Sequence, residues 1–309
     1  MTRSSLPSPA TTRSLYPDAR ASRTREELAR APIGVFDSGL GGLTVVRALR
    51  QACPHEDIVY LGDTARVPYG TRSAQTVIRY ARGCARVLTE RGVKALVLAC
   101  NTVSAVAVEI LQADLDMPVI GVVEPGSRAA VIAAEKEAAR TGGPPPKIGV
   151  LGTQGTVNSG AYPRKVSQLS TRLEVLGQAA PLLVPLVEEG WLEGQVPELA
   201  VERYVAPLLA DGAGVLVLGC THYPLLRPIV ERVASRLAGH PIPVVDSAEA
   251  TAELTLEMLR EGRIPPTNRA EIGSLELLVT DLPGGFQRVA DLFLGENTPE
   301  VQQIDLTMG

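Results

Sequence analysis

Two cysteines in this chain each follow a short apolar run and precede a polar one. Cys100 comes directly after the apolar residues 95–99, and Cys220 comes after residues 215–219. Such runs are typical of buried strands in a parallel sheet, and ligands bind at the carboxyl ends of those strands. A thiol there also lies at the start of the next helix, whose dipole lowers the pKa of a cysteine. We therefore predict two reactive thiols in one site; the alternative is a pair of buried, inert cysteines.

The segments around the two cysteines repeat along the chain. An apolar run enters a Gly-rich turn at residues 33–42 and again at residues 148–156, and each cysteine follows its opening run at a similar spacing. Residues 117–121 are matched in the second half by residues 242–246. Strand and helix patterns alternate throughout, as in parallel α/β proteins. The sequence predicts an α/β fold of two pseudo-symmetric domains with mainly parallel sheets flanked by helices, and an active site in the cleft between them.

Four motifs carry a resemblance to a known family. They are Asp-Ser-Gly-Leu-Gly-Gly at 37–42, Asp-Thr-Ala-Arg-Val-Pro-Tyr-Gly at 63–70, Cys-Asn-Thr at 100–102 and Cys-Thr-His-Tyr-Pro at 220–224. In this order they closely resemble glutamate racemase, of the aspartate/glutamate racemase family, and the resemblance extends from about residue 33 to about residue 294. The related aspartate racemases would lack the Tyr-Pro pair and usually carry Glu in place of His222.

The resemblance implies that two opposed bases racemise glutamate. A single base recaptures its own proton, so removal from one face of Cα and return to the other needs a residue on each side. By the resemblance, Cys220 takes the proton from L-glutamate and Cys100 protonates the opposite face, with the roles reversed for D-glutamate. Asp37 would assist Cys100, and His222 would assist Cys220. The structural alternatives are a turn or helix cap for Asp37 and a buried structural histidine for His222.

Other motif residues are expected to bind the substrate. A carboxylate and a hydroxyl after the first strand would receive the ammonium group, polar residues at helix starts would hold the α-carboxylate, and the Pro-Tyr-Gly loop would hold the side-chain carboxylate. In that order the residues are Asp37 and Ser38; Asn101, Thr102 and Thr221; and, as the resemblance implies, Tyr69 and Gly70. His222 is also expected to contact the substrate. Thr153 and Thr156, in the matching turn of the second half, would add contacts.

The composition excludes several classes of protein. At 309 residues and a net charge of −4, the chain has room for two domains and no broad basic surface for nucleic acid. Its four cysteines form neither a disulfide framework nor a Cys-x-x-Cys pair, so we expect a reducing cytoplasm and no metal. None of its four lysines follows a strand end at the cleft, so neither pyridoxal phosphate nor another cofactor is expected. No apolar stretch has the length of a membrane span or a signal core.

Composition and resemblance together imply a division of the chain. Residues 1–31, rich in Ser, Thr, Pro and Arg, are expected to be a disordered extension. Residues 32–127 with 248–295 would form the first α/β domain, residues 128–247 the second, and residues 296–309 a C-terminal tail. The proline run at 141–147 would then be a surface loop of the second domain, although composition alone places a linker there.

Three functions fit these observations. The leading hypothesis is a cytoplasmic, homodimeric racemase without cofactor, which by family analogy supplies D-glutamate for peptidoglycan. The second is racemisation of aspartate or another acidic amino acid on the same fold. The third is of another class, a protein that binds and inhibits DNA gyrase, for which the basic N-terminal extension is the motive. Neither nucleic acid nor a membrane is expected as a partner.

Overall fold

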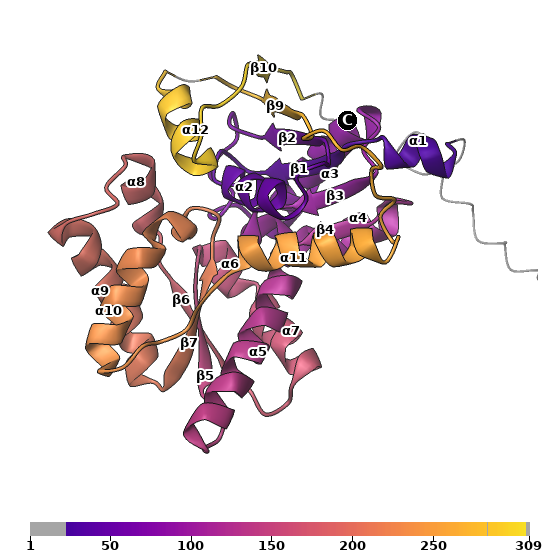
Figure 1. Cartoon of the computed structure of the whole chain (residues 1–309). Helices are drawn as coiled ribbons and strands as arrows, with labels where there is room; N and C mark the ends of the chain where they lie inside the picture. Colours follow the sequence, from indigo (N-terminus) through magenta and orange to yellow (C-terminus); the bar gives the residue numbers. More distant parts are fainter. Residues whose placement is uncertain (1–22, 283, 307–309) are drawn as a thin grey trace, which may run out of the picture.

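The computed structural model describes residues 23–282 and 284–306, and in this part of the chain two parallel β-sheets are flanked by helices (Figure 1). Within the described residues the first sheet has six strands and the second has four. The first sheet runs β10 (Val301–Gln303), β9 (Leu275–Val279), β2 (Ile58–Gly62), β1 (Ile33–Asp37), β3 (Ala95–Leu98) and β4 (Val119–Gly121). The second runs β6 (Val175–Ala179), β5 (Lys147–Gly152), β7 (Ala213–Gly219) and β8 (Val244–Asp246).

The repeat predicted from the sequence recurs in the order of the strands. The first sheet contains the order β2-β1-β3-β4 and the second the order β6-β5-β7-β8, so β1 corresponds to β5 and β3 to β7. In both sheets the opening strand of the repeat pairs in parallel with the strand that precedes a cysteine. The predicted α/β class with mainly parallel sheets flanked by helices is therefore confirmed.

Helices pack on both faces of each sheet, because successive side chains of a strand point to opposite faces and those of the central strands are buried on both. Val35 belongs to one apolar cluster and Phe36 to another on the opposite face of the first sheet. In the second sheet, Leu216 and Val217 likewise belong to two different apolar clusters on opposite faces. The longer helices are α2 (Leu43–Ala52), α3 (Ala74–Glu90), α4 (Asn101–Asp114), α5 (Val123–Thr141), α7 (Ala161–Leu169), α9 (Gln195–Ala210), α10 (Arg227–Ala238), α11 (Ser247–Arg260) and α12 (Phe286–Leu294). The shorter ones are α1 (Arg25–Ala29), α6 (Gln154–Asn158), α8 (Leu183–Glu188) and the 3₁₀ turn η1 (Tyr223–Leu226).

The two sheets share one apolar core. A single cluster of buried side chains includes Val35 of β1 and Leu218 of β7, together with residues of α2, α10, α11 and α12. In Figure 1, α11 lies across the view just below the first sheet, and it packs against both α2 and α5. This shared core fixes how the carboxyl ends of β1 and β3 face those of β5 and β7.

The predicted disorder of residues 1–31 is wrong for the end of that segment. Thr24 and Glu27 form a reciprocal capping box at the start of α1, and the buried Lys94 ammonium donates to the Ala29 carbonyl at 2.9 Å. These bonds satisfy the helix ends and hold α1 on the first sheet. Residues 1–22 lie outside the described residues.

Three further boundaries differ from the prediction or refine it. The expected tail at 296–309 contains β10, which pairs with β9 and extends the first sheet, because Val301–Gln303 has extended backbone beside an open strand edge. The proposed boundary at 127–128 falls inside α5, which packs on β7. The proline run at 141–147 is a loop between α5 and β5 that is exposed over most of its length.

Among the described residues, no helix combines the length and the apolar character that crossing a bilayer requires.

Candidate active site

Cys100 lies two residues after β3 and is the N-cap residue of α4, although its side chain makes no capping hydrogen bond. Its side chain is buried, and Sγ lies 3.4 Å from Ser38 Oγ, to which it donates. Burial and the negative charge of Asp37 raise the pKa of Cys100 to about 12. The expected lowering by the helix start is therefore wrong for this thiol, because loss of water disfavours the thiolate more strongly than the helix stabilises it.

Cys220 follows β7 and faces an imidazole. Its Sγ is 3.9 Å from His222 Nδ1, and His222 Nε2 is 3.0 Å from Glu188 Oε1. Burial acts to lower the pKa of His222, but hydrogen bonding to Cys220 and Glu188 outweighs it and raises that pKa to about 10. A cationic imidazole between a thiol and a carboxylate can stabilise negative charge on sulfur.

The expected helix start after Cys220 is displaced. Thr221 lies before a 3₁₀ turn that begins at Tyr223, and the longer helix α10 begins only at Arg227. Pro224, the second residue of this turn, has no backbone N–H to donate to the Cys220 carbonyl, so regular α-helix does not begin at Thr221. Thr221 is instead held by its carbonyl, which accepts a hydrogen bond from Thr44 Oγ1 at 3.0 Å.

Asp37 is the last residue of β1, and its charge interacts with Cys100 and with His222. Its Oδ2 accepts from the Gly39 N–H at 3.0 Å, while its buried Oδ1 has no hydrogen-bond partner among the described residues. Burial raises the pKa of Asp37, although the charge of His222 acts in the opposite direction. The charge of Cys220 also contributes to the raised pKa of Cys100. The structure thus brings Asp37, Cys100, Cys220 and His222 into one electrostatic neighbourhood, and a buried unpaired oxygen indicates a place for a donor such as an ammonium group.

The Gly-rich turn after β1 contacts the segment that carries the second cysteine. A Cβ added at Gly41 would meet Thr221 Oγ1 and would lie 2.5 Å from His222 Nδ1. Only glycine leaves room for this close approach. The turn that carries Asp37 and Ser38 therefore packs directly on the residues beside Cys220.

The predicted threonines gather where the two halves of the chain meet. Thr102 Oγ1 lies 2.9 Å from Thr153 Oγ1 and 3.3 Å from Thr156 Oγ1. The Gly155 N–H donates to the Gly70 carbonyl at 2.9 Å, so the 63–70 loop of the first sheet touches the turn after β5. These contacts bring hydroxyl and backbone groups of the two halves of the chain together at one place.

Tyr69 is buried, and its hydroxyl donates to Asp63 Oδ2. Asp63 also accepts from Arg66 at 2.7 Å and from Thr280 Oγ1 at 2.8 Å. The hydroxyl of Tyr69 is therefore engaged within the first sheet, and the Tyr69–Gly70 segment presents its backbone to the neighbouring turn. Its role toward a substrate stays a prediction.

Comparison with known proteins agrees with this geometry. Residues 33–255 match the family model described as Asp/Glu/Hydantoin racemase. The chain belongs to the Asp/Glu/Hydantoin racemase family. The match covers most of the chain and includes both cysteine motifs, which confirms the resemblance stated from four short motifs.

Several glutamate racemases of this family are similar to this chain over most of its length. A glutamate racemase of Geobacter metallireducens is 46% identical over 275 residues, which cover 89% of this chain and 96% of that protein. The solved glutamate racemases of Thermus thermophilus and Francisella tularensis superpose with TM-scores of 0.76 and 0.79, at 42% and 32% identity. Each alignment covers 90% of this chain and 98% of the other. The Francisella protein was solved in complex with D-glutamate.

Sequence reasoning missed two acidic residues at this racemase-type site. Glu188 ends the short helix α8, far from any cysteine motif, and a charged residue at such a place reads as an exposed surface group. Asp63 lies within the second motif, but no role was expected for it. The signal for Glu188 is its place directly after the apolar run 183–187. Such a run predicts a short buried helix, so the acid that follows it lies at the edge of the buried region.

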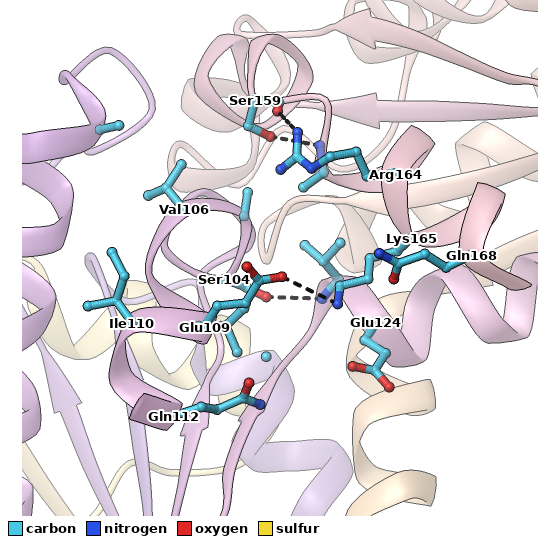
Figure 2. Close-up of a pocket in the computed structure, with 16 residues that line it drawn as sticks. Ser104, Val106, Glu109, Ile110, Gln112, Glu124, Ser159, Arg164, Lys165 and Gln168 are labelled. Carbon is cyan, nitrogen blue, oxygen red and sulfur yellow. Dashed lines mark hydrogen bonds and ion pairs between the residues drawn. The ribbon is translucent and has the colours of Figure 1, made fainter. Parts of the chain in front are cut away.

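A separate pocket of about 430 Å³ lies between α4 and α7 (Figure 2). Figure 2 shows Lys165 facing Glu109 across it, and their charged atoms are 3.6 Å apart. None of the predicted site residues is among the described side chains that line this pocket. It is therefore distinct from the candidate active site of this family member.

Proposed function

We propose that the protein interconverts L- and D-glutamate by a two-base reaction at Cys100 and Cys220, without a cofactor. The observation that supports this best is the pair of buried thiols, which follow corresponding strands of two repeated sheets. Each thiol has its own polar partner, and the charge of one affects the other. The Francisella relative, solved with D-glutamate, favours glutamate as the substrate.

In the L to D direction, Cys220 takes the Cα proton as a thiolate, leaving a carbanion at Cα. Cys100 then delivers its S–H proton to the opposite face and becomes the thiolate. The raised pKa of Cys100 suits it to hold a proton before this step. His222, paired with Glu188, offsets negative charge near Cys220. For D-glutamate the two thiols exchange roles.

The substrate contacts follow from the same arrangement. Asp37 and Ser38 would receive the ammonium group, because the buried Asp37 Oδ1 has an unused acceptor. The polar groups around the junction of the sheets would hold the two carboxylates. They are Asn101, Thr102, Thr153, Thr156 and Thr221, with the backbone of Tyr69 and Gly70. Preorganised donors of this kind stabilise a developing carbanion.

Several finer points belong to the same proposal. We assign residues 32–127 with 248–295, together with α1 and β10, to one domain and residues 128–247 to the other, with the site between them. By family analogy the enzyme is a cytoplasmic homodimer whose D-glutamate enters peptidoglycan. The gyrase hypothesis depends on the basic extension, most of which lies outside the described residues, and no contact described here favours it.

A substrate panel tests the proposal. The purified full-length protein is incubated without added cofactor with L-glutamate, L-aspartate and other acidic amino acids, and optical rotation is followed over time. We expect L-glutamate to reach the racemic mixture, with aspartate much slower. A clear preference for aspartate, or no change with any substrate, would contradict it.

A further inference from the structure

Two buried residues outside the proposed chemistry lie on either side of Asn101. Tyr162 comes from α7 and Ser247 from the start of α11, whereas Asn101 opens α4 directly after Cys100. All three side chains are at most 3% exposed. Polar side chains buried to this degree are kept only with hydrogen-bond partners, and these three supply partners to one another.

Their hydrogen bonds form a chain with one direction. The Tyr162 hydroxyl donates to Asn101 Oδ1 at 2.8 Å, Asn101 Nδ2 donates to Ser247 Oγ at 3.4 Å, and Ser247 Oγ donates to the Leu218 carbonyl at 3.0 Å. Each hydroxyl has a single proton, so each bond fixes the donor of the next. The Asn101 amide is thereby oriented with its oxygen toward Tyr162, and its nitrogen keeps one further N–H.

The chain of bonds connects the two cysteine segments. Asn101 directly follows Cys100, and Leu218 lies in β7 two residues before Cys220. The Tyr162 ring also packs against the strand end, because a Cβ added at Gly219 would lie 3.3 Å from its Cε2 atom. Burial raises the pKa of the Tyr162 hydroxyl far above neutrality, so it remains a neutral donor. The same three side chains therefore contact the strand of one thiol and the helix start of the other.

We propose that Tyr162 and Ser247 are positioning residues that orient the Asn101 amide and hold the Cys100 segment in place relative to the Cys220 strand. This inference depends on the proposed function, in which the free N–H of Asn101 meets the substrate carboxylate. Neither residue touches the reacting atoms. Each acts through Asn101.

A double-mutant cycle tests this. We expect Y162F to lower kcat/KM for L-glutamate about ten-fold, because that factor corresponds to the free energy of one oriented hydrogen bond. In an N101A background the same Y162F change should have almost no further effect, because the group that Tyr162 orients is gone. S247A should behave in the same way. The matched controls are Y204F on α9 and S127A, whose hydroxyl donates to the Val123 carbonyl of its own helix, and both should keep wild-type kinetics.

A purely structural role would give a different result. Y162F would then lower kcat/KM by the same factor with and without Asn101, and that outcome would overturn the inference. The same cycle is measured by urea unfolding, which does not depend on activity. Additive shifts of the unfolding midpoint for Y162F and N101A would show that the hydrogen bond is absent and would also overturn it. A wild-type protein inactive on glutamate would instead refute the proposed function, and the unfolding cycle would still decide on the bond.

Discussion

Cys100 and Cys220 have different neighbours, and these give each thiol its own part in the proposed reaction. Cys100 is buried beside a carboxylate, a setting that favours the protonated thiol. Cys220 faces an imidazole that is itself paired with Glu188. A protonated thiol on one side and a cation beside the thiol on the other suit removal of the Cα proton from L-glutamate and delivery to the opposite face.

Serine substitution should separate the two roles. We expect C100S and C220S each to lower racemisation about 100- to 10,000-fold, since a serine hydroxyl cannot replace a positioned thiol acid or base. Each variant keeps one thiol, so each should still eliminate HCl from one enantiomer of a β-chloro analogue of glutamate. C100S should act on the L form and C220S on the D form, as chiral chromatography of the remaining analogue would show.

The control is C53S, at a buried cysteine outside the site, which should keep racemase activity. Far-UV circular dichroism of all three variants reports whether they are folded. If both active-site variants eliminated from the same enantiomer, or if either one kept near-wild-type racemisation, the two-base assignment would be wrong.

The pKa of His222 gives a second prediction at this scale. It is raised from 6.5 to about 10 in the folded protein, so the pairing of His222 stabilises the fold fully below pH 6.5, and this contribution is lost as the pH rises through 10. E188Q removes one partner and should lower that pKa. The urea midpoint of E188Q should therefore fall below that of the wild type at pH 6–7, and the difference should vanish near pH 10.

NMR titration of the ring provides the direct readout, because the chain has only three histidines and the other two are exposed. E189Q removes the same charge from the neighbouring, exposed position and should leave the titration of His222 unchanged. An unchanged His222 midpoint in E188Q would show that the imidazole and Glu188 are not coupled.

Among the elements, the ends of four strands determine the site. β1 and β3 pair in parallel and lead to Asp37 and Cys100, and β5 and β7 pair in the same way and lead to Thr153 and Cys220. The sequence predicted these positions because short apolar runs followed by polar residues define strand ends locally. It did not predict Glu188 or Tyr162, since their partners lie 34 and 61 residues away and depend on how helices pack on the second sheet.

The turn between β1 and α2 should tolerate no side chain at its centre. We expect G41A to lower kcat/KM strongly and to destabilise the fold by about 1–3 kcal/mol, the usual cost of overpacking. The physical reason is the contact of the added methyl group with Thr221 and His222. Urea unfolding and steady-state kinetics measure the two effects.

G143A is the matched control, because its added Cβ would meet nothing closer than Thr141 Oγ1 at 3.7 Å. It should behave as the wild type in both assays. A G41A variant with wild-type kinetics would mean that the Gly-rich turn does not set the position of His222.

For the molecule as a whole, two repeated sheets share one core and bring two thiols together. The repeat and the parallel α/β class could be predicted from the sequence, because apolar periodicity and Gly-rich turns are local signals. The extent of the first sheet could not. β10 is a three-residue strand with mostly exposed side chains, and α1 depends on the buried Lys94, which bonds Ala29 and lies 2.5 Å from Glu56. Such elements are stabilised by residues distant in the sequence and not by a hydrophobic pattern within their own segments.

Isotope exchange tests the central claim, that two separate groups handle the Cα proton. L-glutamate is incubated with the wild-type protein in deuterated water, and both enantiomers are analysed by mass spectrometry at low conversion. Two opposed bases predict that the D-glutamate formed carries deuterium at Cα, because the delivering thiol exchanges with solvent, while the remaining L-glutamate keeps its proton. D-glutamate that retains the original proton, or L-glutamate that exchanges as fast as product forms, would contradict the account.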